Sequence, residues 1–148
     1  LVKSGAERLG ISIIETHAGD ARVLRDAWVE RADRVLCDVP CSGFGVISKK
    51  PELRYKDPKE SERLPEIQRA ILDNASRYVK VGGTLVYSTC TLLPEENQQN
   101  IQDFLVRHPE FSLAPWSVGS LEVSSGMITL MPHIHNTDGF FIAKLIRK

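Results

Sequence analysis

The chain has 148 residues, of which 42% are hydrophobic and 26% charged, a composition typical of one soluble globular domain. Its 19 lysines and arginines equal its 19 aspartates and glutamates, so net charge gives no sign of a polyanionic partner. No segment approaches the roughly 18 apolar residues of a membrane span, and the first residues lack the apolar core of a signal peptide. We therefore expect a cytoplasmic protein without a membrane partner.

Strands and helices alternate along the chain. Residues 1–9 resemble the second half of a helix, and the β-branched-rich segments that follow predict strands at 11–16, 34–39 and 84–89. A crossover helix is predicted over 61–80, where one side of a 3.6-residue period carries Leu64, Ile67, Ile71, Ala75 and Tyr78. We expect Gly82-Gly83 to end this helix.

A second helix is predicted after the last of these strands. Pro94-Glu95-Glu96 places a proline and two acidic residues in its first turn, and the helix ends near His108. Its buried stripe is expected to contain Ile101, Phe104 and Leu105.

The end of the chain predicts an antiparallel pair of strands, 127–132 and 139–146, that closes one edge of the sheet. These elements indicate an α/β fold with an open, mostly parallel sheet and an antiparallel C-terminal hairpin. We find no glycine-rich strand-to-helix turn of the dinucleotide-binding kind, so we expect the sheet to lack its N-terminal strands. Residues 1–148 are interpreted as the C-terminal portion of a single domain.

Ligands of open parallel sheets collect beyond the carboxyl ends of the strands. Asp20 follows the first predicted strand, Asp38 and Cys41 follow the second, and Cys90 follows the third. Two thiols and two carboxylates are therefore expected on one rim.

Each of these residues also has an ordinary structural interpretation. A free cysteine is most often buried, and this remains our interpretation of Cys37, inside an apolar strand. Cys41 and Cys90 lie in turns, where exposure and nearby backbone N–H groups would stabilise a thiolate. Asp20 and Asp38 could instead be helix N-caps. A zinc site of Cys37, Cys41 and His17 has no supporting ligand spacing, and we expect no metal.

A basic stretch lies between the second strand and the crossover helix. Its six cations are Lys49, Lys50, Arg54, Lys56, Lys59 and Arg63. Acidic residues interrupt it, so it is either a solvated face or a lip that contacts phosphates.

Two long motifs in the sequence are specific enough to indicate one protein family. Residues 38–45, Asp-Val-Pro-Cys-Ser-Gly-Phe-Gly, resemble the Asp-Ala-Pro-Cys-Ser-Gly motif of the Sun-type (Fmu/Sun) RNA cytosine-5 methyltransferases. Residues 87–97 resemble the same family's Thr-Cys-Ser…Pro-Glu-Glu-Asn motif, and residues 19–22 its adenine-side turn. Residues 132–133 together with 137–141 resemble its closing motif. The resemblance implies a Rossmann-like domain of which this chain is the C-terminal part.

The resemblance also implies roles and partners. Cys90 matches the nucleophile, Cys41 the cysteine that helps to release product, Asp20 the carboxylate near adenine, and Asp38 the carboxylate near the methionine amino group and target base. S-adenosylmethionine is the implied cofactor and RNA the implied partner, ribosomal 16S RNA before transfer RNA. We expect a monomer, inactive as an isolated fragment because the glycine-rich cofactor loop and the ribose-binding acidic residue have no match.

The chemistry supports these roles. Carbon 5 of cytosine is a poor nucleophile, so a thiolate first adds to carbon 6 and makes carbon 5 nucleophilic. Asp38 would assist at N3 if burial raised its pKa. Two alternatives remain open: a non-catalytic RNA- or partner-binding remnant, and a DNA cytosine methyltransferase, in which the Pro-Cys cysteine is the nucleophile.

Overall fold

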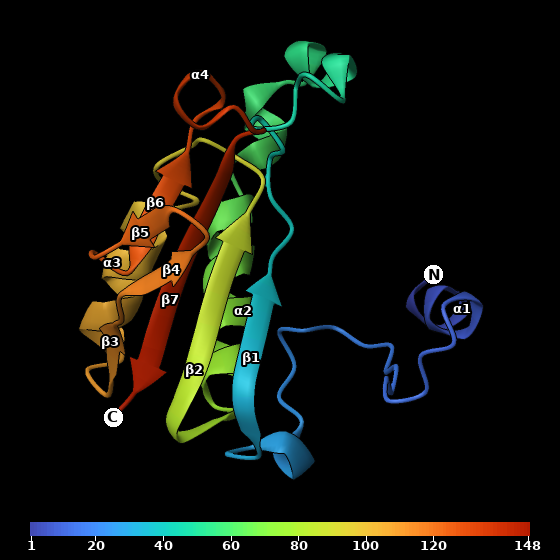
Figure 1. The fold of residues 1–148 in the computed structure, drawn as a ribbon, viewed down its shortest axis with the longest axis vertical. Helices are drawn as coiled ribbons and strands as arrows, with labels where there is room; N and C mark the ends of the chain where they lie inside the picture. Colours follow the sequence, from blue (N-terminus) through green and yellow to red (C-terminus); the bar gives the residue numbers. More distant parts are fainter.

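The structure, a computed structural model, describes residues 1–148, with every side chain except those of Pro58 and Glu60. Figure 1 shows the elements in sequence colours. The helices are α1 (Val2–Arg8), α2 (Leu64–Ser76), α3 (Gln98–Arg107) and α4 (Pro132–His135), with short 3-10 helices η1 (Asp26–Trp28), η2 (Pro51–Tyr55) and η3 (Pro58–Ser61). The strands are β1 (Ala32–Asp38), β2 (Val79–Thr89), β3 (Phe111–Leu113), β4 (Trp116–Val118), β5 (Leu121–Val123), β6 (Met127–Leu130) and β7 (Phe140–Arg147).

The main sheet has the order β1-β2-β7-β3, and β6 also pairs with β7. β1 and β2 are parallel, with Asp38 opposite Ser88, whereas β7 runs antiparallel to β2, β3 and β6. Because β1 and β2 are parallel, their carboxyl ends lie at the same edge, the upper one in Figure 1. We call this edge the rim.

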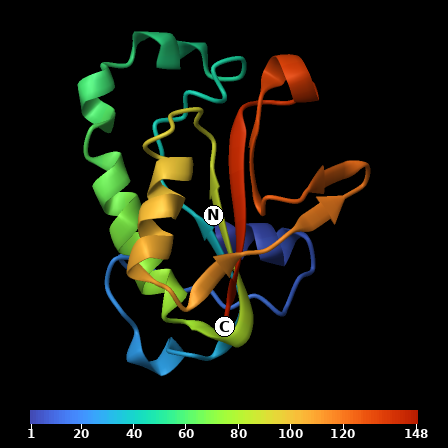
Figure 2. The same ribbon diagram turned by 90° about the vertical axis from the view of Figure 1, so that its left-hand side faces the viewer.

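One face of the sheet is covered by α2 and α3, which lie side by side in Figure 2. The crossover from β1 to β2 passes through α2, as expected for a parallel pair. The core between the helices and the sheet includes Leu72, Leu85, Ile101, Phe104 and Leu145, each 0% exposed. This packing fixes the positions at which β1 and β2 end.

The predicted α/β class is confirmed, and so are the strands at 34–39 and 84–89 and the antiparallel C-terminal pair. Among the described residues the main sheet has one parallel pairing, β1 with β2, beside the antiparallel pairings of β7. β7 is nevertheless not an edge strand, because it lies between β2 and the strands β3 and β6. Its residues Phe141, Ala143 and Leu145 are at most 1% exposed. The apolar side chains that alternate along β7 therefore point into the core, and the strand itself lies in the interior of the sheet.

The strand predicted at 11–16 is wrong. These residues form no strand, and they run with α1 beside the sheet, away from β1 (Figure 1). A strand needs a neighbour to satisfy its backbone groups, and among the described residues β1 pairs with β2 alone. Ile13 is 90% exposed, and Ile11 and Ile14 are 40% and 45% exposed, so the apolar side chains of this segment are not buried within residues 1–148.

The crossover helix is shorter than predicted, and Gly82-Gly83 does not end it. α2 ends at Ser76, and β2 begins at Val79, before the glycines. The register between β1 and β2 shifts between Val79 and Thr84, where Gly82 has a φ of +77°. A side chain at Gly83 would lie 2.8 Å from the Lys80 carbonyl oxygen. The two glycines therefore permit an irregularity inside β2, where a residue with a side chain would not fit.

Pro94-Glu95-Glu96 also lies outside the helix that it was expected to begin. These residues form a turn before α3, which starts after Asn97, a residue with non-helical φ and ψ of −112° and −109°. Ile101 and Phe104 are buried as predicted, and Leu105 packs at the edge of the core. Among the described residues, no helix is long and apolar enough to cross a membrane.

Candidate active site

Cys41 and Cys90 lie side by side at the rim. Each follows the carboxyl end of its strand, β1 or β2, and their Sγ atoms are 3.2 Å apart. The Cys90 backbone N–H also donates to Cys41 Sγ over 3.3 Å. The pairing of two parallel strands thus brings together two thiols separated by 49 positions in the sequence.

The electrostatic state of Cys41 differs from the expectation of a stabilised thiolate. Burial raises the pKa of Cys41 to about 12, and the hydrogen bond to the Cys90 side chain acts in the same direction. Backbone N–H groups of Cys90 and Gly43 lower this pKa, but burial outweighs them. Cys41 is therefore a protonated thiol at neutral pH and can donate a hydrogen bond to its neighbour.

Cys37 keeps its structural interpretation. It is 4% exposed and belongs to the core cluster, and burial raises its pKa to about 12. A thiol in such surroundings stays neutral and unreactive.

Asp38 lies at the last position of β1, three residues before Cys41. The Ser88 hydroxyl, opposite in the register, donates to Asp38 Oδ1 over 2.8 Å. Asp38 is exposed, so the burial on which a proton-donor role depended is absent. Its carboxyl group is instead accessible at the rim to a bound ligand or to a nucleotide base.

Asp20 and Asp38 line the same cavity, of about 300 Å³, beside β1. Apolar and aromatic residues complete the wall, among them Val35, Leu36, Ile71, Trp28 and Tyr78. Neither Cys41 nor Cys90 is among its described lining residues. The four predicted site residues thus form two groups, the thiol pair and the two carboxylates. Asp38 links them, because it ends β1 directly before the loop that carries Cys41.

Asp20 is not a helix N-cap, because a turn follows it and η1 begins only at Asp26. Its carboxylate is held by Arg22, whose Nη2 lies 2.6 Å from Oδ2. The hydrogen bond from the Arg22 side chain lowers the pKa of Asp20 to about 2, so this carboxylate is charged at neutral pH. Asp20 can therefore accept hydrogen bonds from a ligand in the cavity.

Three loops meet above the thiols. Gly45 N–H donates to the Cys90 carbonyl over 2.9 Å, and Gly139 N–H donates to the Gly45 carbonyl over 2.7 Å. Asp138 accepts from Ser48 Oγ at 2.8 Å and pairs with Lys49 Nζ at 2.5 Å. The segment predicted as a closing motif therefore fixes the loop after Cys41.

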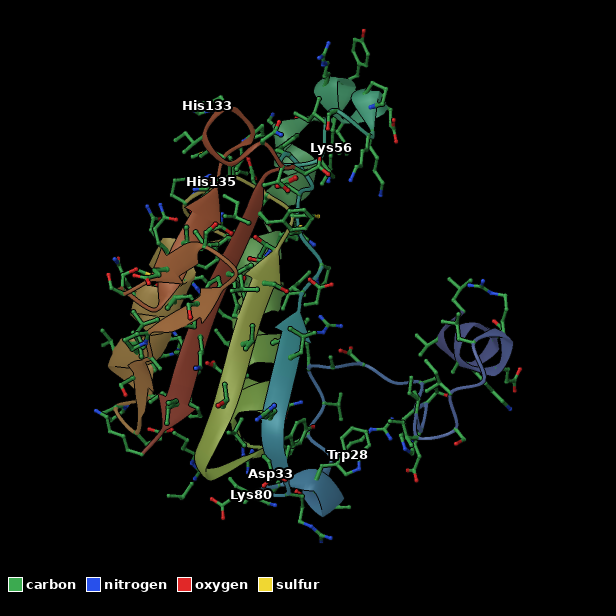
Figure 3. The ribbon with its side chains drawn as sticks, viewed as in Figure 1. Trp28, Asp33, Lys56, Lys80, His133 and His135 are labelled. Carbon is green, nitrogen blue, oxygen red and sulfur yellow. The ribbon has the colours of Figure 1, made fainter. Side chains whose placement is uncertain are left out.

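The basic stretch lies above the same rim, where Figure 3 labels Lys56. Lys56 Nζ donates to the Ser42 carbonyl over 3.4 Å, and Lys49 is occupied by Asp138. Arg54 and Lys59 are exposed, as both a solvated face and a lip that contacts phosphates require. The described residues contain no group of three or more His, Cys, Asp or Glu side chains that could hold a metal ion.

Sequence reasoning missed the buried polar residues beneath the thiols. Gln68 and Thr91 are 0% exposed, and Ser42 is 1% exposed. Ser42 Oγ and Thr91 Oγ1 are 2.6 Å apart, which joins the two cysteine loops directly. The available signal was a polar residue, Gln68, four positions before Leu72 on the buried face of α2.

Comparison with known proteins identifies the family. The model of the family described as 16S rRNA methyltransferase RsmB/F matches residues 1–146. The chain belongs to this family. The match includes both cysteine loops and the closing motif, so the resemblance drawn from the motifs is confirmed.

Related sequences and solved structures support the same family assignment. The probable ribosomal RNA small subunit methyltransferase B of Bacillus subtilis is 44% identical over 100% of this chain and 35% of its own length. The crystal structure of NSun6 from Pyrococcus horikoshii with SFG has a TM-score of 0.82 and 36% identity over 98% of this chain and 37% of that chain. A methyltransferase homolog protein from the same organism has a TM-score of 0.76 and 31% identity over 99% of this chain and 48% of that chain. The chain thus spans about a third of its curated relative.

Proposed function

We propose that this chain carries the catalytic centre of an S-adenosylmethionine-dependent RNA cytosine-5 methyltransferase that acts on 16S ribosomal RNA. The observation that carries the proposal is the pair of thiols at the rim, with Sγ atoms 3.2 Å apart. Membership of an rRNA methyltransferase family supports the substrate class. The substrate would meet the enzyme in the cytoplasm, and transfer RNA is the alternative substrate.

In this mechanism Cys90 is the nucleophile. Its thiolate forms a bond to carbon 6 of the target cytosine, and the electron pair of the 5,6 double bond makes carbon 5 nucleophilic. Carbon 5 would take the methyl group from the sulfonium sulfur of S-adenosylmethionine, which would leave as the neutral thioether S-adenosylhomocysteine, and a base would then remove the carbon-5 proton. The 5,6 double bond then reforms and the bond from carbon 6 to Cys90 Sγ breaks.

Cys41 acts in the release step. Because its pKa is raised to about 12, Cys41 holds its proton at neutral pH and is better suited to donate a hydrogen bond than to act as the base. The adjacent Cys90 sulfur gains negative charge as its bond to carbon 6 breaks. A hydrogen bond from Cys41 to that sulfur would lower the barrier to release.

The cavity beside β1 suits S-adenosylmethionine in its chemistry. This cofactor supplies an electrophilic methyl group on a sulfonium centre. Asp38 would bind its cationic amino group, Asp20 would accept hydrogen bonds on the adenine side, and apolar residues such as Leu36 and Ile71 would contact the rings. Asp38 also ends β1 directly before the Cys41 loop, so it would align the methyl donor with the target base.

RNA would approach over the basic lip. Lys56 and the exposed Arg54 and Lys59 lie above the thiols and can contact phosphates, which position a substrate without reading its sequence. The target base must leave its stack before carbon 6 can meet Cys90, and a loop or flipped nucleotide satisfies this need.

Adduct trapping tests the assignment of the cysteines. In the complete protein, Cys90→Ala should abolish turnover and form no covalent species with RNA. Cys41→Ala should still methylate but release slowly, so a protein–RNA adduct accumulates. Denaturing gels with labelled RNA and S-adenosylmethionine measure both outcomes. Ser117→Ala is the control that should behave like the unaltered protein, because Ser117 is an exposed residue of β4 outside the rim and the cavity beside β1.

The opposite results would point to the alternatives. An adduct with Cys90→Ala but none with Cys41→Ala would reverse the roles and favour the DNA-type arrangement. Turnover without adducts in both variants would end the covalent mechanism. If the complete protein has no turnover on RNA, the non-catalytic remnant is the better description.

A further inference from the structure

A buried carboxyl group lies between the two cysteine loops, outside the chemistry described so far. Glu96 is 1% exposed. Its Oε2 accepts hydrogen bonds from the Ser42 backbone N–H at 3.0 Å and from Gln68 Nε2 at 2.7 Å. Burial of a carboxyl group is costly, and these two bonds to Oε2 offset part of that cost, since Oε1 is buried without a hydrogen-bond partner among the described residues.

The same buried side chains also bind the two residues that flank Cys41 in the sequence. Gln68 Nε2 also donates to the Pro40 carbonyl over 2.9 Å, while Glu96 holds the N–H of Ser42. The residues directly before and after Cys41 are therefore tied to one pair of buried side chains. Gln68 belongs to α2, whose packing on the sheet fixes its position.

Glu96 is in turn fixed to the strand that leads to Cys90. The Tyr87 hydroxyl donates to the Glu96 carbonyl over 2.7 Å. The side chain of Asn97 accepts from Thr89 Oγ1 at 2.6 Å and donates to the Thr91 carbonyl at 3.0 Å. Glu96 and the Cys90 loop thus form one hydrogen-bonded unit, and the carboxyl group joins this unit to the Cys41 loop.

We infer that Glu96 is a positioning residue that holds the Cys41 sulfur against Cys90 and thereby controls the release step. The inference rests on the proposed function. Gly43, two residues after Cys41, has a φ of +80°, so the loop has no regular secondary structure of its own to keep it in place. Without the bond from Ser42 N–H to Glu96, the loop can move and the 3.2 Å separation of the thiols is lost.

Three variants of the complete protein test this role. Glu96→Leu fills the space but accepts no hydrogen bond, whereas Glu96→Gln keeps an oxygen that can accept from both Ser42 and Gln68. Glu96→Leu should slow release of methylated RNA by about 10- to 100-fold and accumulate adduct, as a misplaced catalytic group does. Glu96→Gln should restore release to within about threefold of the unaltered rate. Glu95→Leu changes the neighbouring exposed carboxylate and should have no effect.

The double variant separates positioning from general destabilisation. If Glu96 acts through Cys41, then Cys41→Ala combined with Glu96→Leu should release RNA no more slowly than Cys41→Ala alone. Additive losses, or an equal loss of adduct formation and release, would overturn the inference. Should Glu96→Leu fail to fold, Gln68→Met removes the donor to both Glu96 and Pro40 and should show the same adduct accumulation, and normal release would overturn the inference.

The controls also separate this inference from the proposed function. If Cys41→Ala accumulates adduct and folded Glu96→Leu does not, the inference about Glu96 fails and the proposed function stands. If Cys41→Ala forms no adduct, the proposed release role of Cys41 fails, and the inference about Glu96 fails with it.

Discussion

Asp38 occupies a position that the proposed cofactor and the proposed target base would share, because of where its strand ends. It closes β1, lines the cavity beside that strand and begins the loop that carries Cys41. Ser88 donates to its Oδ1, an interaction that an asparagine carbonyl oxygen could also accept. The charge of Asp38 is therefore available for function rather than needed for folding.

Asp38→Asn in the complete protein should damage the chemical step far more than folding. The change keeps the size of the side chain but removes the charge that would hold the cofactor's amino group. Single-turnover methylation should fall by at least about tenfold, while the thermal midpoint stays within a few degrees. Asp33→Asn, at the opposite end of β1 beside Lys80 (Figure 3), is the matched control. An unchanged single-turnover rate in folded Asp38→Asn would contradict the assignment.

Cys37 gives a prediction about stability and pH. Burial raises its pKa from 9.0 to about 12, so above pH 9 the unfolded chain loses this proton while the folded chain keeps it. The contribution of this neutral thiol is complete below pH 9 and is lost as the pH rises towards 12, by up to about 1.4 kcal/mol per pH unit.

Urea unfolding at pH 8, 9 and 10 measures this effect. The free energy of unfolding should decrease with pH less steeply in Cys37→Ala than in the unaltered protein, whatever their stabilities at pH 8. Parallel pH profiles for the two proteins would contradict the role assigned to burial.

At the scale of elements, the rim depends on loops that touch through their backbones. Gly45 lies between the Cys90 carbonyl and Gly139, at the point where the loop after Cys41 meets the closing segment. A side chain at Gly45 would clash with the Gly139 carbonyl and would lie 2.8 Å from the Cys90 carbonyl oxygen. Backbone on two sides leaves no flexible atom that could move away.

Gly45→Ala should therefore separate the loops. We expect destabilisation of about 1–3 kcal/mol, as for other overpacked sites, and a loss of adduct formation larger than that stability change explains. Gly5→Ala is the control, because a side chain there would meet nothing within 4 Å. Chemical denaturation and adduct gels measure the two effects, and Gly45→Ala with normal stability and adduct formation would refute the close approach.

At the scale of the whole molecule, one side of the sheet has little covering it. Leu36 of β1 is 70% exposed, although it lines the candidate cofactor cavity. Residues 17–25 reach the side of this strand without forming one of their own, and the residues before them run away from it (Figure 1). The cavity therefore offers carboxylates and apolar contacts, but the described residues include no glycine-rich backbone cradle.

We predict that purified residues 1–148 have no appreciable methyltransferase activity, because a cofactor also needs a backbone cradle and a partner for its ribose. Binding of radiolabelled S-adenosylmethionine should be weak for this chain and at least about tenfold stronger for a version extended upstream to the length of its relatives. Robust turnover by residues 1–148 alone would contradict the prediction.

The sequence alone determined the family, the strands that end at the rim and the residues placed there. Local signals sufficed for these features, because β-branched runs predict β1 and β2, and parallel strands bring Asp38, Cys41 and Cys90 to one edge. The two cysteine motifs were specific enough to indicate a cytosine methyltransferase before any geometry was known.

Other features were decided only by the tertiary structure. The segment 11–16 has the pattern of a strand but no neighbour to pair with, and Gly82-Gly83 has the pattern of a helix stop but serves an irregularity inside β2. The protonated state of Cys41 and the contact from Glu96 to Ser42 depend on burial and on residues 54 positions apart. Pairing, burial and long-range hydrogen bonds depend on what surrounds a residue in space, which a local pattern does not contain.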